Sequence, residues 1–174
     1  MAESLKAEDI EKIDVLIANA GSGTCFRSTV DTPLSSIAID FYANIFGPIA
    51  LYQTLLPFLK ASTNAKFVII GSILGSIGAM MPGAPTLSYR TSKAAVHYAA
   101  KRIHDEEEKM IVLTIHPGWV QTKNGQTFVD SIGVPAPPMM VGQSAEGVLA
   151  QIDAATQETT SGTFVGFDGA EVPW

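Results

Sequence analysis

The chain has 174 residues, of which 47% are hydrophobic and 16% are charged, and its formal net charge at pH 7 is −6. This length and apolar balance predict one folded domain over residues 1–174, with a hydrophobic core, and they argue against a disordered chain. The negative charge disfavours nucleic acid or an anionic membrane surface as a partner, and the single cysteine excludes an internal disulfide.

The first part of the chain predicts a short helix, a strand and a long helix. The short helix lies in the first twelve residues, which lack the apolar stretch of a signal peptide, so we expect a cytoplasmic protein. The apolar strand covers 13–18. The long helix runs from about 33 to 60, with Asp31 or Thr32 as the N-cap and Pro33 in the first turn. Polar residues and prolines interrupt its apolar surface, so we expect a buried or interface helix and not a membrane span.

The rest of the chain continues this alternation of strands and helices. In chain order, the predicted elements are a strand at 66–70, a helix at about 86–108, a strand at 110–115, a proline-containing loop at 121–140, a helix at about 144–156 and a strand at 162–167.

Apolar strands that are each followed by a helix predict an α/β fold with a parallel sheet covered on both faces. Ligands bind such sheets at the carboxyl ends of the strands. The turns that carry Asn19, Ser72 and Pro117-Gly118 lie at those ends, and the helix that carries Tyr89 begins at the same edge. The sequence therefore predicts a binding site there.

Tyr89 and Lys93 are four residues apart, so their side chains share one face of the predicted helix. A nearby ammonium favours the phenolate, so we expect Lys93 to lower the pKa of Tyr89 and to make it a proton donor or acceptor. The alternative interpretation is a surface pair on a helix.

Two further polar residues have a structural and a catalytic interpretation. Asn44 lies inside the apolar helix and, taken alone, is better explained as a partner of neighbouring backbone. Ser72 follows a strand and, taken alone, is better explained as a turn or cap residue. Their occurrence in order with Tyr89 and Lys93 favours an active site.

Together with Asn19-Ala20-Gly21 and residues 117–122, these four residues resemble the short-chain dehydrogenase/reductase family over nearly the whole chain. The last eight residues also resemble the end of fungal reductases that act on polyketides. The resemblance implies that Tyr89 exchanges a proton with the substrate oxygen and that Lys93 holds the phenolate and the nicotinamide ribose. It implies that Ser72 donates a hydrogen bond to the substrate carbonyl and that Asn44 holds a water.

The resemblance also implies NADP as the cofactor and no metal. The residues that would contact the nicotinamide end are Asn19, Ala20, Gly21, Tyr89, Lys93, Pro117, Gly118, Val120 and Thr122.

The glycine-rich βαβ half with which the family pattern begins is missing from this sequence, so the chain resembles an N-terminally truncated member with a partial Rossmann-like parallel sheet of about four strands. Gly71-x-x-x-Gly75-x-x-Gly78 follows a strand but leads into no helix, so we reject it as a phosphate loop. We therefore expect this chain alone to bind NADP poorly or not at all.

Three functions remain open. In the first, the chain comes from an NADP-linked oxidoreductase lineage that acts on a ketone or hydroxyl group of a polyketide or aromatic small molecule, and it is either an incomplete product or works with a nucleotide-binding half supplied by another segment. Alternatively, the same four residues catalyse isomerisation, dehydration or cyclisation without a cofactor. As a third alternative, the chain is a non-catalytic remnant that binds a full-length relative.

The missing half also predicts contacts with other segments or chains. Strand 13–18 would keep an uncovered apolar edge, so we expect residues 1–12, a second copy or another partner to cover it. Family dimers pack two long helices against each other, so the resemblance implies a homo-oligomer formed through helices 33–60 and 86–108.

Overall fold

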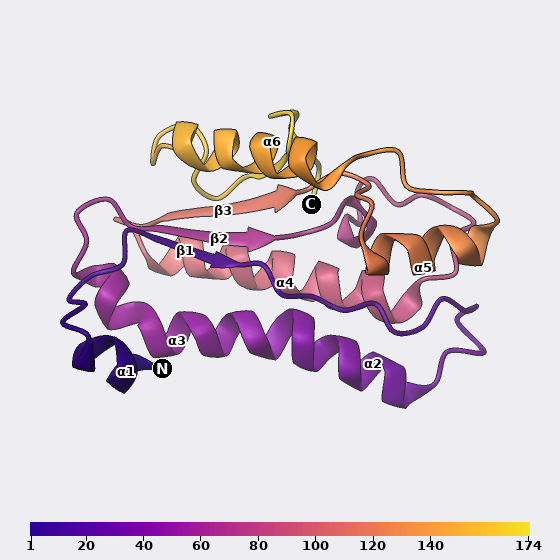
Figure 1. The fold of residues 1–174 in the computed structure, drawn as a ribbon, viewed down its shortest axis with the longest axis horizontal. Coiled ribbons are helices and arrows are strands. Elements are labelled where there is room, and N and C mark those ends of the chain that lie inside the picture. Colours follow the sequence, from indigo (N-terminus) through magenta and orange to yellow (C-terminus); the bar gives the residue numbers. More distant parts are fainter.

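The computed structural model describes all 174 residues and contains one parallel sheet with helices on both faces (Figure 1). Every strand pair is parallel, and the strands lie in the sheet in chain order. The four strands are β1 (Val15–Ala18), β2 (Lys66–Ile70), β3 (Ile111–His116) and β4 (Phe164–Gly166). This arrangement confirms the predicted α/β class and the four-stranded partial sheet.

The helices form two layers (Figure 1). One face of the sheet is covered by α4 and by a continuous helix composed of α2, a π-helical turn η1 and α3, and the other face is covered by α6. Their bounds are α2 (Leu34–Phe41), η1 (Tyr42–Phe46), α3 (Gly47–Lys60), α4 (Leu87–Glu106) and α6 (Val141–Ala154).

Each face of the sheet has its own core, because successive side chains of a strand point to opposite faces. In β2, Phe67 and Ile69 belong to the cluster beneath α3 and α4, whereas Val68 belongs to the cluster beneath α6. Strands buried on both faces need apolar residues at every position, which explains the unbroken apolar runs of the sequence.

Residues 121–140 are not all loop, and that prediction is wrong for α5 (Lys123–Ile132). Thr122 caps this helix by accepting a hydrogen bond from the Gly125 backbone N–H at 3.1 Å, and Gly133 ends it in the left-handed conformation. The prolines that suggested a loop follow the helix and do not interrupt it.

The predicted N-cap of the long helix is also wrong. Pro33 occupies the N-cap position without a side-chain bond, whereas the Thr32 hydroxyl donates to the Ser28 carbonyl at 2.8 Å. Asp31 accepts a hydrogen bond from the Ser28 hydroxyl. Both side chains therefore stabilise the turn that precedes the helix.

β1 is an edge strand that pairs only with β2. Val15 and Ile17 on this strand remain 42% and 38% exposed. The predicted N-terminal helix, α1 (Ala2–Ala7), lies beside the end of α3 and not along β1 (Figure 1). Residues 1–12 therefore do not cover this edge.

The continuous helix from Leu34 to Lys60 is long and apolar enough to cross a membrane by length and composition alone. In the fold, one of its faces contributes Tyr52, Leu55 and Leu59 to the interior. Only 22% of its most apolar stretch is buried, so the helix packs on the core with one face and leaves the rest of its apolar surface exposed.

Candidate active site

A cavity of about 1150 Å³ lies at the carboxyl ends of the strands, where the sequence predicted a site. Every predicted site residue except Asn44 lines it. These lining residues are Asn19, Ala20, Gly21, Ser72, Tyr89, Lys93, Pro117, Gly118, Val120 and Thr122. Segments separated by more than one hundred residues thus meet in one space, as the topology of a parallel sheet requires.

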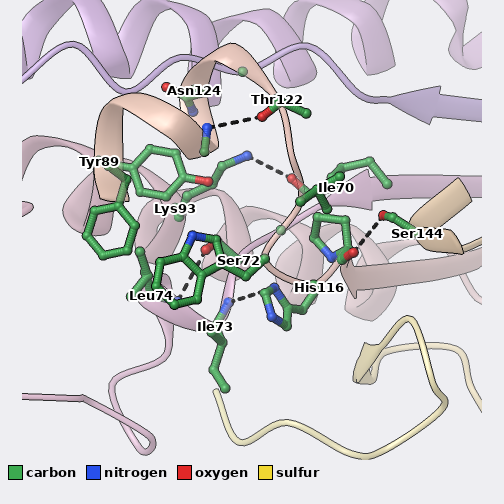
Figure 2. A pocket seen from close by; sticks show the side chains of 18 of the residues that line it. Ile70, Ser72, Ile73, Leu74, Tyr89, Lys93, His116, Thr122, Asn124 and Ser144 are labelled. Carbon is green, nitrogen blue, oxygen red and sulfur yellow. Dashed lines mark hydrogen bonds between the residues drawn. The ribbon is translucent and has the colours of Figure 1, made fainter. Parts of the chain in front are cut away.

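Ser72, Tyr89 and Lys93 face one another in this cavity (Figure 2). Ser72 follows β2 and caps a single 3-10 turn, η2 (Ile73–Gly75), whereas Tyr89 and Lys93 lie on successive turns of α4. The Ser72 hydroxyl lies close enough to the Tyr89 phenol to influence its pKa. The alternative interpretation of Tyr89 and Lys93 as a surface pair is excluded, because Lys93 is only 4% exposed.

The pKa of Tyr89 is raised above its ordinary value, which differs from the prediction. Burial of the phenol is the main cause, the nearby Ser72 hydroxyl lowers the pKa in opposition, and the negative charge of Asp40 raises it further. Lys93 lies with its ammonium 5.8 Å from the centre of the Tyr89 ring and donates instead to the Ile70 carbonyl at 2.7 Å. Tyr89 is consequently protonated at neutral pH and is placed to donate a proton.

Burial lowers the pKa of Lys93 to about 8, so the side chain is mostly charged at pH 7. Gly21, in the turn after β1, lies close to this charge. A Cβ atom on Gly21 would lie 3.1 Å from Asn44 Oδ1 and 3.4 Å from Lys93 Nζ. The absence of a side chain at Gly21 therefore lets the turn after β1 approach both residues.

Asn44 lies in the π-helical turn, a type of helix distortion that is frequent at functional sites. Its side chain accepts from the Ser22 backbone N–H and donates to the Ser22 carbonyl, each at 2.8 Å. It also donates to the Ser92 hydroxyl at 2.8 Å. Asn44 thus holds the turn after β1 against α4, as the structural interpretation predicted.

Asp40 is a residue that the sequence reasoning missed. Its carboxylate is fully buried one helical turn before Asn44. It accepts hydrogen bonds from the Ser22 hydroxyl at 2.9 Å, the Thr24 backbone N–H at 3.1 Å and the Ser88 hydroxyl at 2.7 Å. The available signal was a charged residue in an apolar helix, four positions before Asn44. A buried carboxylate requires hydrogen-bond donors, so its position indicates polar partners nearby.

Three aromatic residues form one side of the cavity, and we call Phe26, Trp119 and Phe128 the aromatic wall. They come from the turn after β1, the turn after β3 and α5. The Phe26 and Phe128 rings are 5.7 Å apart, and the Trp119 and Phe128 rings are 5.6 Å apart. Phe128 was missed because its helix was predicted as a loop.

The cavity fits the nicotinamide end of a dinucleotide, because all the residues predicted to contact that end line it. No glycine-rich strand-to-helix turn occurs among the 174 residues. Gly75 packs on α4 so closely that a Cβ atom there would lie 2.7 Å from Lys93 Cβ and 2.8 Å from the Ala94 nitrogen. The Gly75 N–H already donates to the Ser72 carbonyl at 2.8 Å, so it is not free to bind a phosphate group.

The family model of short chain dehydrogenases matches residues 3–132 of this chain. The chain is 36% identical over 169 residues to norsolorinic acid ketoreductase of Aspergillus parasiticus, covering 95% of this chain and 62% of that protein. It is 34% identical over 176 residues to short-chain dehydrogenase srdF of Neurospora crassa, covering 99% of this chain and 69% of that protein. An NADPH-bound carbonyl reductase from chicken fatty liver superposes with a TM-score of 0.86 at 25% identity, covering 99% of this chain and 70% of that one.

Proposed function

The chain belongs to the short-chain dehydrogenase family, and we propose that it forms the catalytic part of a ketoreductase. Its substrate would be a ketone, or in reverse a hydroxyl group, on an aromatic, polyketide-type small molecule. The observation that carries this proposal is the meeting of Ser72, Tyr89 and Lys93 in one cavity beside the aromatic wall. Aromatic side chains provide flat, apolar contact area for a planar substrate.

In reduction, Tyr89 donates its phenolic proton to the substrate oxygen, because its raised pKa keeps that proton in place at neutral pH. Ser72 donates a hydrogen bond to the same oxygen as negative charge develops there. Lys93 then stabilises the phenolate that remains on Tyr89, because a buried ammonium interacts strongly with a nearby anion.

The hydride for this reduction would come from NADPH, held at its nicotinamide end by Asn19, Gly21, Lys93 and Val120. The chain offers no counterpart for the pyrophosphate. Each charge-assisted hydrogen bond lost there costs ~1.5–3 kcal/mol. We therefore infer that NADPH binds this chain weakly unless another polypeptide segment supplies the phosphate site.

Calorimetric titration of the purified chain with NADPH tests the cofactor proposal. We expect dissociation constants in the millimolar range or no measurable heat. Binding in the micromolar range would contradict this proposal and would indicate that the chain alone acts as an NADPH-dependent reductase.

A second candidate function is acid/base catalysis without hydride transfer: isomerisation, dehydration or cyclisation of a phenolic or ketonic molecule. It is favoured by the completeness of the Ser72, Tyr89 and Lys93 set within this chain, in contrast to the incomplete nucleotide site. Turnover of an aromatic ketone without NADPH would support it. Turnover that requires both NADPH and an added nucleotide-binding segment would support the ketoreductase.

Replacement of Tyr89 by phenylalanine tests both catalytic proposals. Loss of a positioned proton donor lowers kcat by about 100- to 10,000-fold. The matched control is Tyr98→Phe, since Tyr98 lies on the same helix but is 75% exposed. Full activity of Tyr89→Phe would contradict both proposals. Inactivity of the wild-type chain with every ketone tested would favour a non-catalytic role.

A further inference from the structure

The turn that carries Ser72 is held by an uncommon set of acceptors. Three consecutive backbone N–H groups donate to side chains. The Ser72 N–H donates to His97 Nε2 at 3.2 Å. The Ile73 N–H donates to His116 Nδ1 at 3.3 Å (Figure 2), and the Leu74 N–H donates to the Ser72 hydroxyl at 3.2 Å. Two imidazoles from different elements therefore hold the backbone on either side of the Ser72 side chain.

The local packing is built around these contacts. Gly71 precedes the turn, and a Cβ atom there would lie 2.7 Å from His97 Nε2. Only glycine therefore lets the His97 ring approach the backbone at this point. His97 is 3% exposed and packs against the ring of Phe164 at 4.4 Å, so its position is restricted by neighbours on β4.

An imidazole nitrogen accepts a hydrogen bond only when it carries no proton, so the contacts require neutral rings of defined tautomer. His97 must carry its proton on Nδ1, and His116 must carry its proton on Nε2. Burial favours the neutral forms and lowers the pKa of His97 to about 3 and that of His116 to about 4. The charge of Lys93 lowers the pKa of His97 further, whereas Asp168 acts in the opposite direction on His116.

We propose that His97 and His116 are positioning residues that aim the Ser72 hydroxyl at the substrate oxygen through its backbone. This inference rests on the proposed function of Ser72 as a donor to that oxygen. Neither histidine contacts the reacting atoms. Their effect is to fix the turn that begins at Ser72 so that the hydroxyl does not have to reorient during the reaction.

Paired substitutions separate this role from simple packing. His97→Leu and His116→Leu keep an apolar side chain but remove the acceptor. His97→Gln and His116→Asn place an amide oxygen near the position of the accepting nitrogen. We expect kcat to fall by about 10- to 100-fold in the leucine variants, with KM changed less than about twofold, and to recover largely in the amide variants.

A spectroscopic measurement tests the contacts without any turnover. Long-range ¹H–¹⁵N correlation spectra of the labelled full chain should show neutral His97 protonated on Nδ1 and neutral His116 protonated on Nε2 at pH 7. The opposite tautomer, or an imidazolium at either position, would overturn the inference even if no substrate were found. Retained kcat in both leucine variants, or equal loss in the leucine and amide variants, would overturn it as well. Circular dichroism confirms that each variant compared is folded.

Discussion

At the scale of single residues, the burial of Lys93 connects catalysis with stability. Its side chain is 4% exposed, and its ammonium finds one backbone acceptor, the Ile70 carbonyl. Burial lowers its pKa from 10.5 to about 8. Charged Lys93 is therefore unfavourable for folding although the proposed chemistry needs it, a conflict typical of functional sites.

This conflict predicts opposite pH trends for activity and stability. Above pH 8 the folded chain loses the Lys93 proton, so kcat should fall. The unfolded chain keeps that proton up to about pH 10.5, so it binds more protons in this window, and the Lys93 contribution to the free energy of unfolding should rise. A pH–rate profile and urea unfolding of wild type and Lys93→Met measure the two trends. If the contribution of Lys93 to the free energy of unfolding fell between pH 8 and 10, the lowered pKa of Lys93 in the folded chain would be contradicted.

Lys93→Met should make the protein more stable and inactive. At pH 7 the burial of the charge costs ~3.5 kcal/mol, since 2.5 pKa units correspond to about 1.4 kcal/mol each. Loss of the bond to the Ile70 carbonyl offsets about 1 kcal/mol, which leaves a net gain of about 2.5 kcal/mol in the free energy of unfolding. Lys109→Met, at an exposed position, is the control for urea unfolding at pH 7. A destabilised Lys93→Met protein would show that the ammonium contributes more to folding than its burial costs.

The close packing of Gly75 on α4 predicts that one added methyl group strongly lowers the free energy of unfolding. An added Cβ atom would collide with the backbone of α4 at Lys93 and Ala94, which cannot yield as a flexible side chain does. We expect Gly75→Ala to lower the free energy of unfolding by about 2–3 kcal/mol. Thermal unfolding measures this, with Gly142→Ala as the control because a Cβ atom on Gly142 meets nothing within 4 Å. Equal melting temperatures for Gly75→Ala and wild type would contradict the close packing.

At the scale of elements, α5 decides the shape of the substrate space, because it brings Phe128 against Phe26 and Trp119. Its N-terminal residues Asn124 and Gly125 also line the cavity. This short amphipathic helix is capped by Thr122 and ended by Gly133, and it places the Phe128 ring in the wall of the cavity.

Phe128→Ala should therefore change substrate preference more than chemistry. Removing one ring of the aromatic wall should raise KM for an aromatic ketone by about tenfold, given ~1.5 kcal/mol for an aromatic contact. KM for a small aliphatic ketone should stay nearly constant. Thr127→Ala, at the neighbouring exposed position, is the control. Equal changes for both substrates would show that α5 has a general structural role.

At the scale of the whole molecule, the continuous helix leaves an apolar face without a partner. Ile39, Tyr42 and Phe46 are 52%, 67% and 50% exposed, and the Tyr42 and Phe46 rings are in contact. This face belongs to the helices through which the sequence predicted a homo-oligomer, and we keep that prediction as a proposal. Exposed patches of this kind mark interaction surfaces.

Phe46→Asp should shift the protein from dimer to monomer, because the substitution would place a charge in an apolar contact. Light scattering after size-exclusion chromatography measures the mass. Val30→Asp is the control, since Val30 is 90% exposed in a loop. A Phe46→Asp variant that remains a dimer would indicate that the dimer contact lies at the free edge of β1. A monomeric wild type would contradict the proposal.

The sequence by itself determined the order of the strands and long helices, the parallel sheet and ten of the residues that line the cavity, but not α5 or Phe128. Periodicity and turn residues are local signals, and the topology of a parallel sheet then brings the strand ends together. Cytoplasmic location and the single domain over 1–174 stay predictions from the same signals.

Only the tertiary structure decided the contacts that set the chemistry of these residues. The direction of the Tyr89 pKa, the partners of Asn44, the burial of Asp40 and the imidazole acceptors of the Ser72 turn depend on groups 16 to 49 positions apart along the chain. Hydrogen bonds and electrostatic interactions act over a few ångströms, so they follow distance in space, which local sequence patterns do not encode.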